Sequence, residues 1–505
     1  MGIIIRQSIK GTVVNFIGVA IGFITTFVVV IRYLTPEEIG LTRILVDAAT
    51  LFSGFALLGT SSSMVRFYPF FKNNEQKDHG FFFWSIAIPL IGFILIALCF
   101  FFLKNTIINA FADKSPLFLQ YFYLLLPLTF CMTYLSIFEL NSNLLMRIVV
   151  PTFIREIGIR VLLLCAYLLY AFKILSLDHF VLVFCSVYAI AAICNIIYLI
   201  SLKKVSFKPD FKHLTKSLQK SFLYYTLFLL IGTLIGSITA TINTFFVSAK
   251  MGLAYTGIFS IATYIAAIIE IPYRSLGAIT QPQIAQTVKE NNFDETSKLC
   301  KNISLHQFIV STFLFFTIWV NIQLIFQILP NGSEYMAGIW VVFFLGLTRI
   351  ITSSFGVGIS ILGYSKYYYY SLFLSILLAG TAIFLNLWLI PLYGIEGAAL
   401  ATFLSTCLDS IFLLTLNKIK LNITPFSIAQ LKIVLILLLM FGFNRIWNFA
   451  LTPLFSQLPI KELYCSILSN SLGTFFTLGA GIVILYCWKV SETVNHLIRK
   501  AFKII

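Results

Sequence analysis

Residues 81–103 read FFFWSIAIPLIGFILIALCFFFL, and this run of twenty-three residues contains no charged side chain. In a helix, at ~1.5 Å per residue, it is long enough to cross the ~30 Å hydrocarbon core of a bilayer. Similar apolar runs recur from Ile9 to Trp488, with only short polar segments between them. We therefore predict an all-α polytopic membrane protein.

The composition supports this class and argues against several others. Hydrophobic residues make up 59% of the 505, and charged residues only 11%, whereas a soluble domain has charge on about a quarter of its residues. The nine cysteines form no CxxC pair and the five histidines lie far apart, so we expect neither a metal site nor another cofactor. No GxxxxGK[ST] motif occurs and the predicted outside loops are short, so the chain is not expected to be an enzyme.

The apolar runs predict about fourteen transmembrane helices. The first run continues from Gly11 to Ile31, which is too long for a cleaved signal peptide, so we expect it to be retained. The predicted helices are residues 9–34, 41–64, 81–103, 116–141, 153–173, 179–202, 221–249, 255–280, 303–328, 337–362, 368–391, 397–416, 428–450 and 464–488.

Lysine and arginine positions predict the orientation. Loops on the side of the N-terminus carry twenty-three of these residues, and loops on the opposite side carry six. Cytoplasmic loops are enriched in basic residues, so both termini are predicted to be cytoplasmic. The net charge of +16 then reflects topology and attraction to anionic lipids, and no nucleic-acid partner is expected.

A basic segment divides the chain. Lysines recur every fourth residue from Lys204 to Lys220, and Phe207, Phe211, Leu214 and Leu218 fall between them. This pattern predicts an amphipathic helix at the membrane surface. The resulting division is an N-lobe of helices 1–6 at 1–202, a basic amphipathic cytoplasmic linker at 203–220, a C-lobe of helices 7–12 at 221–416, and helices 13–14 with a cytoplasmic tail at 417–505.

Ionisable residues inside the predicted helices are the candidate site, because charge at bilayer depth is costly unless it faces protein or water. The candidates that could line a substrate-binding cavity are the ionisable residues Arg43, Asp47, Arg160, Glu270, Arg274 and Arg349, together with the polar residue Asn15. A second interpretation stays open, since Arg43–Asp47, Glu156–Arg160 and Glu270–Arg274 are spaced as intrahelical ion pairs. Arg349 has no acidic residue near it in the sequence.

Two motifs carry a family resemblance. Residues 33–40 read YLTPEEIG, and residues 386–402 read NLWLIPLYGIEGAALAT, where Pro391 is expected to end a helix and Gly394 to form a tight turn. With these motifs the chain resembles the multidrug/oligosaccharidyl-lipid/polysaccharide (MOP) exporter superfamily, especially the Wzx-type flippases of its polysaccharide branch.

The resemblance implies a MATE-like arrangement of two six-helix lobes around a central cavity, plus an extra C-terminal helix pair. It implies movement of an undecaprenyl-pyrophosphate-linked oligosaccharide from the cytoplasmic to the periplasmic leaflet by alternating access. Membrane lipids, glycan polymerase and chain-length proteins are the expected partners of a monomeric protein. No cofactor is expected, and H⁺ or Na⁺ are the candidate coupling ions.

Two alternatives accompany this interpretation. A drug/cation antiporter of the same superfamily commonly has an acidic residue in its first helix, but this chain has no Asp or Glu before Pro36. A non-transporting scaffold of a glycan assembly complex is the alternative from another class. The polar positions along the predicted helices at 41–64 and 255–280 argue against it, since a scaffold has no need of them.

Overall fold

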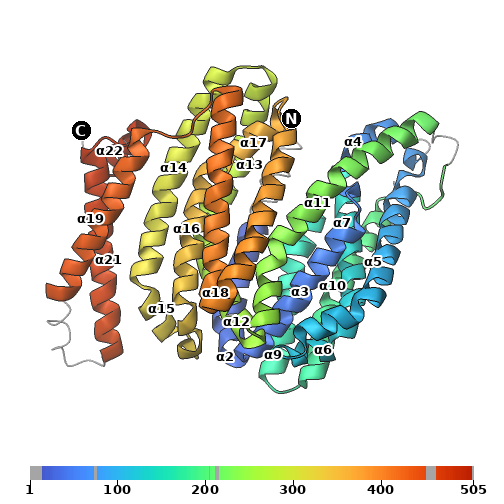
Figure 1. The fold of residues 1–505 in the computed structure, drawn as a ribbon, viewed down its shortest axis with the longest axis horizontal. Helices are drawn as coiled ribbons and strands as arrows, with labels where there is room; N and C mark the ends of the chain where they lie inside the picture. The colour runs from blue at the N-terminus through green and yellow to red at the C-terminus, as the bar shows by residue number, and fades with distance from the viewer. Residues whose placement is uncertain (1–13, 73–76, 204, 211–214, 451–461, 503–505) are drawn as a thin grey trace. The chain divides into compact units, whose positions relative to one another are not determined.

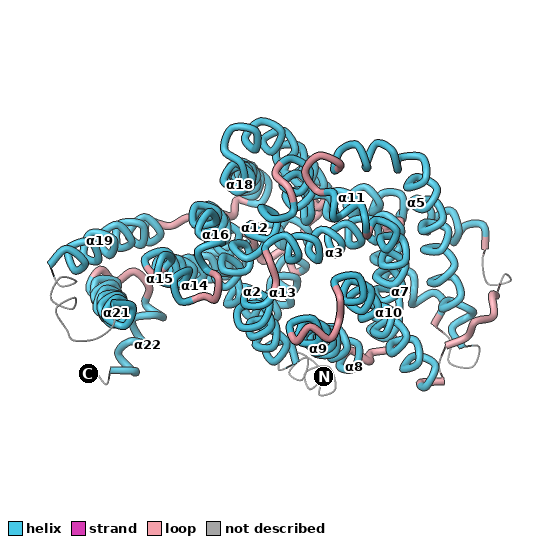
Figure 2. Tube along the Cα trace, turned by 90° about the horizontal axis from the view of Figure 1, so that it is seen from below, coloured by secondary structure: helices cyan, strands magenta, loops and turns pink. Residues whose placement is uncertain are grey.

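The computed structural model describes residues 14–72, 77–203, 205–210, 215–450 and 462–502. Almost all of these residues are helical, and no strand occurs among them (Figures 1 and 2). The chain forms two compact units, one of Met1–Ser260 with Asn386–Gly394 and one of Ile261–Leu385 with Ile395–Ile505. The all-α fold prediction is confirmed.

The first unit is built around α3. This helix packs against α5, α7 and α11, and α10 packs against α7 and α9 (Figure 2). The elements of this unit are the helical span Val14–Tyr33, which contains η1 (Thr25–Val30) and α2 (Ile31–Tyr33), then α3 (Pro36–Ala56), α4 (Thr60–Phe71), η2 (Lys77–Gly80), α5 (Phe81–Phe111), α6 (Pro116–Gln120), η3 (Phe122–Leu124), α7 (Leu125–Leu144), α8 (Val149–Phe153), η4 (Ile154–Gly158), α9 (Ile159–Ala171), α10 (Leu177–Ser201), α11 (Lys216–Lys250) and the first part of α12 (Leu253–Ala267).

The second unit is built around α14, which packs against α13, α16 and α19, while α19 and α21 pack against each other. Its elements after α12 are η5 (Ile268–Glu270), α13 (Ile271–Lys289), α14 (Phe293–Val320), α15 (Ile322–Ile328), η6 (Gly332–Gly338), α16 (Ile339–Phe355), α17 (Val357–Tyr364), α18 (Tyr369–Leu421), α19 (Ile428–Ala450), α21 (Glu462–Cys487) and α22 (Glu492–Phe502). Asn386–Gly394 of α18 belong to the first unit.

Twelve helices among the described residues are long and apolar enough to cross a membrane, so the protein is a multi-pass membrane protein. One of the twelve, α18, covers two predicted helices, and its backbone breaks at Gly394 with φ 59°. The turn predicted at Gly394 is thereby confirmed. The predicted helix at 153–173 is divided between α8, η4 and α9. The count of fourteen stays a prediction.

The helix predicted at 41–64 is interrupted. Helix α3 ends at Ala56 and α4 begins at Thr60, because Leu58 and Gly59 have φ values of 49° and 72°. A Cβ atom at Gly59 would lie 2.7 Å from the backbone nitrogen of Leu230 on α11. Glycine is therefore needed at this turn, both for the left-handed backbone and for the approach of α11.

The interfacial helix predicted over Lys204–Lys220 is wrong over residues 205–210, which are not helical, while residues 216–220 form the start of α11. Two local features explain the difference. Pro209 disfavours a helical conformation of the residue before it, and His79 Nδ1 lies 3.0 Å from Asp210 Oδ2, which fixes the segment beside η2. Residues 211–214 lie outside the described residues, and α11 begins at Lys216.

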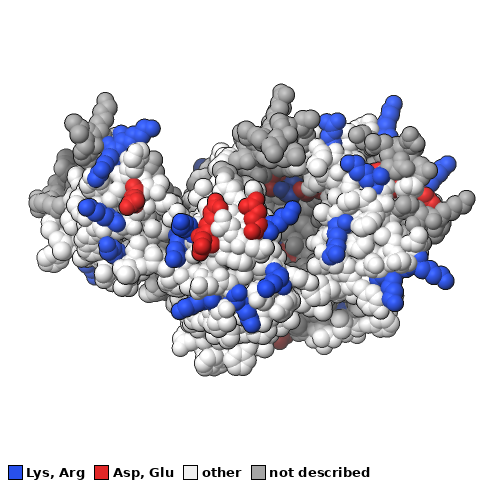
Figure 3. Space-filling model, turned by 90° about the horizontal axis from the view of Figure 1, so that it is seen from above, with Lys and Arg blue, Asp and Glu red and all other residues white. Residues whose placement is uncertain are grey.

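The two compact units do not divide the chain at this segment, because α11 packs on α3 and belongs to the first unit. The division into functional lobes at 1–202 and 221–416 stays a prediction. Lys and Arg side chains predominate over Asp and Glu on the face seen in Figure 3. The orientation in the membrane also stays a prediction.

Candidate functional site

The first candidate pair lies on α3. This helix begins with a capping box, in which the Glu38 N–H donates to Thr35 Oγ1 and the Thr35 N–H donates to the Glu38 carboxylate. Further along, Arg43 Nε donates to Asp47 Oδ2 at 2.8 Å. Thr244 Oγ1 of α11 donates to the same oxygen at 2.6 Å. Asp47 is buried, and its charge is compensated by a cation on its own helix and a hydroxyl on another.

A network of four charged side chains surrounds the π-helical segment η4. Arg160 Nη2 donates to Glu156 Oε2 at 2.9 Å, and Arg155 Nε donates to Glu156 Oε1 at 3.1 Å. Arg155 also donates to Glu139 of α7. Guanidinium and carboxylate groups therefore alternate along this network, in the order Arg160, Glu156, Arg155 and Glu139. π-Helical turns within α-helices are frequent at functional sites, and here the turn contains Glu156.

Glycines on the span Val14–Tyr33 make room for this network. A Cβ atom at Gly18 would lie 2.6 Å from the backbone oxygen of Glu156, and one at Gly22 would lie 3.0 Å from Arg160 Nη1. The guanidinium of Arg160 therefore lies directly over Gly22. Asn15 is exposed on the same span, and no hydrogen bond joins it to another residue in the described part of the chain.

The third group lies in the second unit, where the helical chain is irregular. Between α12 and α13 the segment η5 is a 3-10 turn that ends at Glu270. Arg274 Nε donates to Glu270 Oε1 at 3.3 Å, and Arg349 Nη1 of α16 donates to Glu270 Oε2 at 2.6 Å. The side chains of Glu270, Arg349 and Arg274 are 15%, 27% and 69% exposed. Arg349 is therefore held within the unit, and Arg274 is accessible.

The charge balance distinguishes the second-unit group from the other two. The two groups of the first unit contain equal numbers of carboxylate and guanidinium groups, whereas Glu270 has two guanidinium partners. In addition, Arg349 Nε is buried and has no acceptor among the described residues. A buried donor without an acceptor costs about 1–3 kcal/mol. The Glu270 group thus combines an excess positive charge with an unfilled donor.

Three contacts of this site were not predicted from the sequence. Arg349 has an acidic partner after all, but Glu270 lies seventy-nine residues earlier in the chain. The bonds from Thr244 to Asp47 and from Arg155 to Glu139 also join different helices. Spacing within one helix finds i,i+4 pairs, and it carries no signal for contacts between helices.

A comparison with protein families identifies the chain. The model of the polysaccharide biosynthesis protein family matches residues 4–288, which is more than half of the sequence. The chain belongs to this family.

Solved structures show which fold this polysaccharide biosynthesis protein has. It is similar to the lipid II flippase MurJ in an inward closed conformation, with a TM-score of 0.71 and 15% identity over 96% of this chain and 100% of that chain. A multidrug resistance MATE family transporter in an inward-facing conformation gives a TM-score of 0.59 and 13% identity over 81% and 94% of the two chains.

A MOP superfamily transporter from Pyrococcus furiosus is also similar, with a TM-score of 0.54 and 13% identity over 83% of this chain and 95% of that one. No curated protein matches the sequence. The family match and the MOP fold confirm the resemblance to the polysaccharide branch of the MOP superfamily that the two sequence motifs indicated.

Proposed function

We propose that this polysaccharide biosynthesis protein is a flippase for an undecaprenyl-pyrophosphate-linked oligosaccharide. It would move an O-antigen, capsule or exopolysaccharide unit from the cytoplasmic to the periplasmic leaflet of the bacterial inner membrane by alternating access. The family match and the likeness to a lipid II flippase support a lipid-linked substrate. The observation that carries the proposal is the excess of guanidinium groups around Glu270.

Pyrophosphate is the part of the substrate that such a group suits best. Its charges must lose water to enter a cavity, which costs several kcal/mol per ion unless other charges replace the water. Guanidinium groups bind phosphate oxygens through two parallel N–H bonds, which an ammonium group does not do. Arg274 is exposed enough to make the first contact, and Arg349 has an unfilled donor beside it.

The carboxylate of Glu270 has a role in this scheme. While no substrate is bound, it holds both guanidinium groups, which would otherwise repel each other. An incoming pyrophosphate competes for the same donors, so binding exchanges one anion for another. The released carboxylate could then take up H⁺ or Na⁺, the candidate coupling ions, and Asp47 could exchange Arg43 for an ion in the same way. Glycan polymerase and chain-length proteins would act on the product.

The membrane potential favours the proposed direction. With both termini cytoplasmic, export moves the negative pyrophosphate toward the positive side of the membrane. Each charge that crosses gains about 2.3 kcal/mol per 100 mV. Arg43 and Arg160, which are each paired with a carboxylate, would line the path without trapping the anion.

The test compares variants of this protein in proteoliposomes that contain a fluorescent undecaprenyl-pyrophosphate oligosaccharide. We expect Arg274→Ala and Arg349→Ala to lower the flipping rate, while Arg445→Ala, an exposed arginine on α19, leaves it unchanged. A drug/cation antiporter would instead move a cationic dye against a proton or sodium gradient. A scaffold would move neither compound while still supporting glycan assembly in cells. Either result would exclude the proposed activity.

A further inference from the structure

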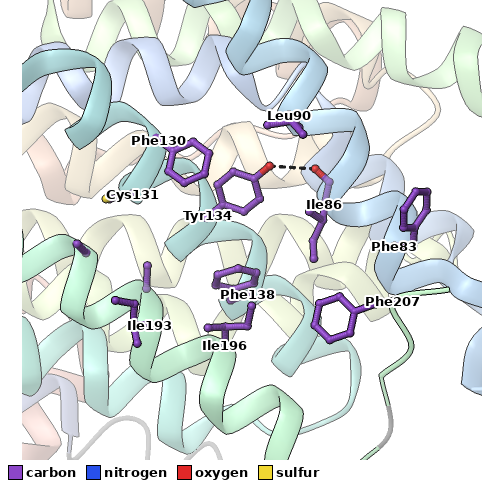
Figure 4. Close-up of a pocket in the computed structure, with 12 residues that line it drawn as sticks. Phe83, Ile86, Leu90, Phe130, Cys131, Tyr134, Phe138, Ile193, Ile196 and Phe207 are labelled. Carbon is purple, nitrogen blue, oxygen red and sulfur yellow. Dashed lines mark hydrogen bonds between the residues drawn. The ribbon is translucent and has the colours of Figure 1, made fainter. Parts of the chain in front are cut away.

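An apolar groove of about 630 Å³ runs along the first unit between α5, α7 and α10 (Figure 4). Its inner wall is formed by the buried residues Tyr134, Phe138 and Ala192. Its rim is formed by residues that are exposed, among them Leu90 and Ile193. The groove is therefore open along its length to whatever surrounds the helices, and none of the candidate site residues lines it.

The one polar group on the inner wall is already bonded. Tyr134 OH donates to the backbone oxygen of Ile86 at 3.2 Å, as the dashed line in Figure 4 shows. With Tyr134 bonded in this way, the groove offers its occupant hydrocarbon only. An apolar chain is the ligand that such a surface suits.

The depth of the groove fits one leaflet of a bilayer. On α5 its lining extends from Phe83 to Leu90, and on α10 from Ala189 to Ile196. Seven residues of helix rise by about 10 Å, while half of a hydrocarbon core is about 15 Å. The groove therefore covers most of the length of a lipid chain within one leaflet.

The segment 205–210 lies at one end of the groove. The ring of Phe207 lines the groove and packs edge-on against Phe82, with ring centroids 5.2 Å apart. This segment is fixed at two points, because Asp210 contacts His79 at 3.0 Å and a Cβ atom at Gly80 would lie 2.5 Å from the backbone oxygen of Lys208. This end of the groove is thus held in place by the fold and lies beside η2.

The same end carries positive charge. Lys208 follows Phe207 directly and Lys203 precedes it by four residues, and both lysines are exposed, while the carboxylate of Asp210 in the same segment is bonded to His79. The segment lies at a helix end, between the close of α10 and the start of α11, where a membrane-spanning chain meets the lipid headgroups. The groove and this segment therefore match the two parts of an anionic phospholipid. The apolar groove suits an acyl chain, and the lysines at headgroup level suit the phosphate.

We propose that this groove binds one anionic phospholipid, with an acyl chain between α5, α7 and α10 and the headgroup phosphate beside Lys203 and Lys208. The site is separate from the candidate transport residues, and the inference does not depend on the proposed flippase activity. Its occupant would fill the space between three helices of the first unit and tie segment 205–210 to them.

The test is native mass spectrometry of the purified full chain after addition of phosphatidylglycerol or phosphatidylcholine. We expect the protein to retain one phosphatidylglycerol in preference to phosphatidylcholine. Ala192→Trp puts an indole ring into the groove and should abolish this retention, while Ile190→Trp, an exposed position on the same helix outside the groove, should not. Ala189→Phe is the second filling variant and replaces Ala192→Trp if that variant does not fold.

The headgroup is tested with Lys203→Ala combined with Lys208→Ala. Lysines near a membrane surface attract anionic lipids, so we expect phosphatidylglycerol to bind at least about tenfold more weakly. Lys104→Ala, an exposed lysine on α5, is the control and should bind as the parent does. Equal retention by the filled and unfilled grooves would overturn the proposal. So would equal binding of both lipids, an unchanged affinity in the lysine variant, or retention of a polyprenyl phosphate in place of the phospholipid.

Discussion

Replacement of Arg349 by alanine tests whether the Glu270 group serves only to stabilise the fold or also binds pyrophosphate. The substitution removes a charge-assisted hydrogen bond of 2.6 Å between largely buried side chains, and such bonds contribute about 1.5–3 kcal/mol. Glu270 keeps its bond to Arg274, but that guanidinium is 69% exposed, and an exposed pair contributes ~1 kcal/mol at most. We therefore expect Arg349→Ala to lower the free energy of unfolding by about 2 kcal/mol.

A second substitution distinguishes the causes. Arg349→Ala with Glu270→Ala removes both largely buried charges and leaves Arg274 in contact with solvent, so most of the lost stability should return. Arg274 and Glu270 are the pair that i,i+4 spacing predicts. A variant with Arg274→Ala and Glu270→Ala leaves Arg349 without its carboxylate, so its stability should stay low. Thermal unfolding in detergent measures these differences, with Arg445→Ala as the matched control.

Flipping in proteoliposomes, normalised to folded protein, is the second measurement. If Arg349 binds pyrophosphate, loss of at least 1.5 kcal/mol of that contact slows flipping about tenfold or more. The stable double variant should be as slow as the single one, and Arg349→Lys should recover part of the rate because it keeps the charge without the planar group. A double variant that is stable and flips at the parent rate would refute the reasoning, since the guanidinium would then serve only to neutralise Glu270.

Three further predictions test other parts of the structure. Gly40→Ala would bring a Cβ atom to 1.9 Å from the backbone oxygen of Leu253 and should lower the melting temperature through overpacking of about 1–3 kcal/mol, whereas Gly236→Ala, which meets nothing within 4 Å, should not. Thr244→Val removes one of two bonds to buried Asp47 and should cost about 1.5–3 kcal/mol in unfolding measurements; an unchanged melting temperature would show that Asp47 finds another donor. In a cysteine-free background, Ser333→Cys should react with an impermeant maleimide added to the periplasmic side and Asn291→Cys only from the cytoplasmic side, and the reverse pattern would invert the proposed orientation.

The sequence predicts those parts of the fold that depend on length, apolarity and local backbone chemistry. Residues 81–103 form the first part of α5, and the break at Gly394 occurs where the motif places it. Prediction from the sequence fails where a contact between residues far apart in the chain decides the local structure. The predicted helix through Leu58 and Gly59 is broken because α11 approaches that turn. Segment 205–210 leaves the predicted helical path because Asp210 is held by His79.

Prediction of the candidate site was limited in the same way, by contacts between residues far apart in the chain. Charge at bilayer depth identified the arginines and carboxylates, and i,i+4 spacing identified their partners on the same helix. The spacing of residues along one helix does not predict contacts between different elements. The bond from Arg349 on α16 to Glu270 in η5 was therefore not expected. That one contact changes the chemistry of the group, because it turns a neutral pair and an isolated cation into one carboxylate shared by two guanidiniums.

Gly40 and Gly257 form a reciprocal contact between the starts of α3 and α12. A Cβ atom at Gly40 would lie 1.9 Å from the backbone oxygen of Leu253, and one at Gly257 would lie 2.0 Å from that of Pro36. The start of α3 and the start of α12 therefore approach each other backbone to backbone, each through a glycine. Because the backbone of one helix occupies the place that a Cβ atom of the other would take, neither position accommodates a larger residue unless the two helix starts move apart.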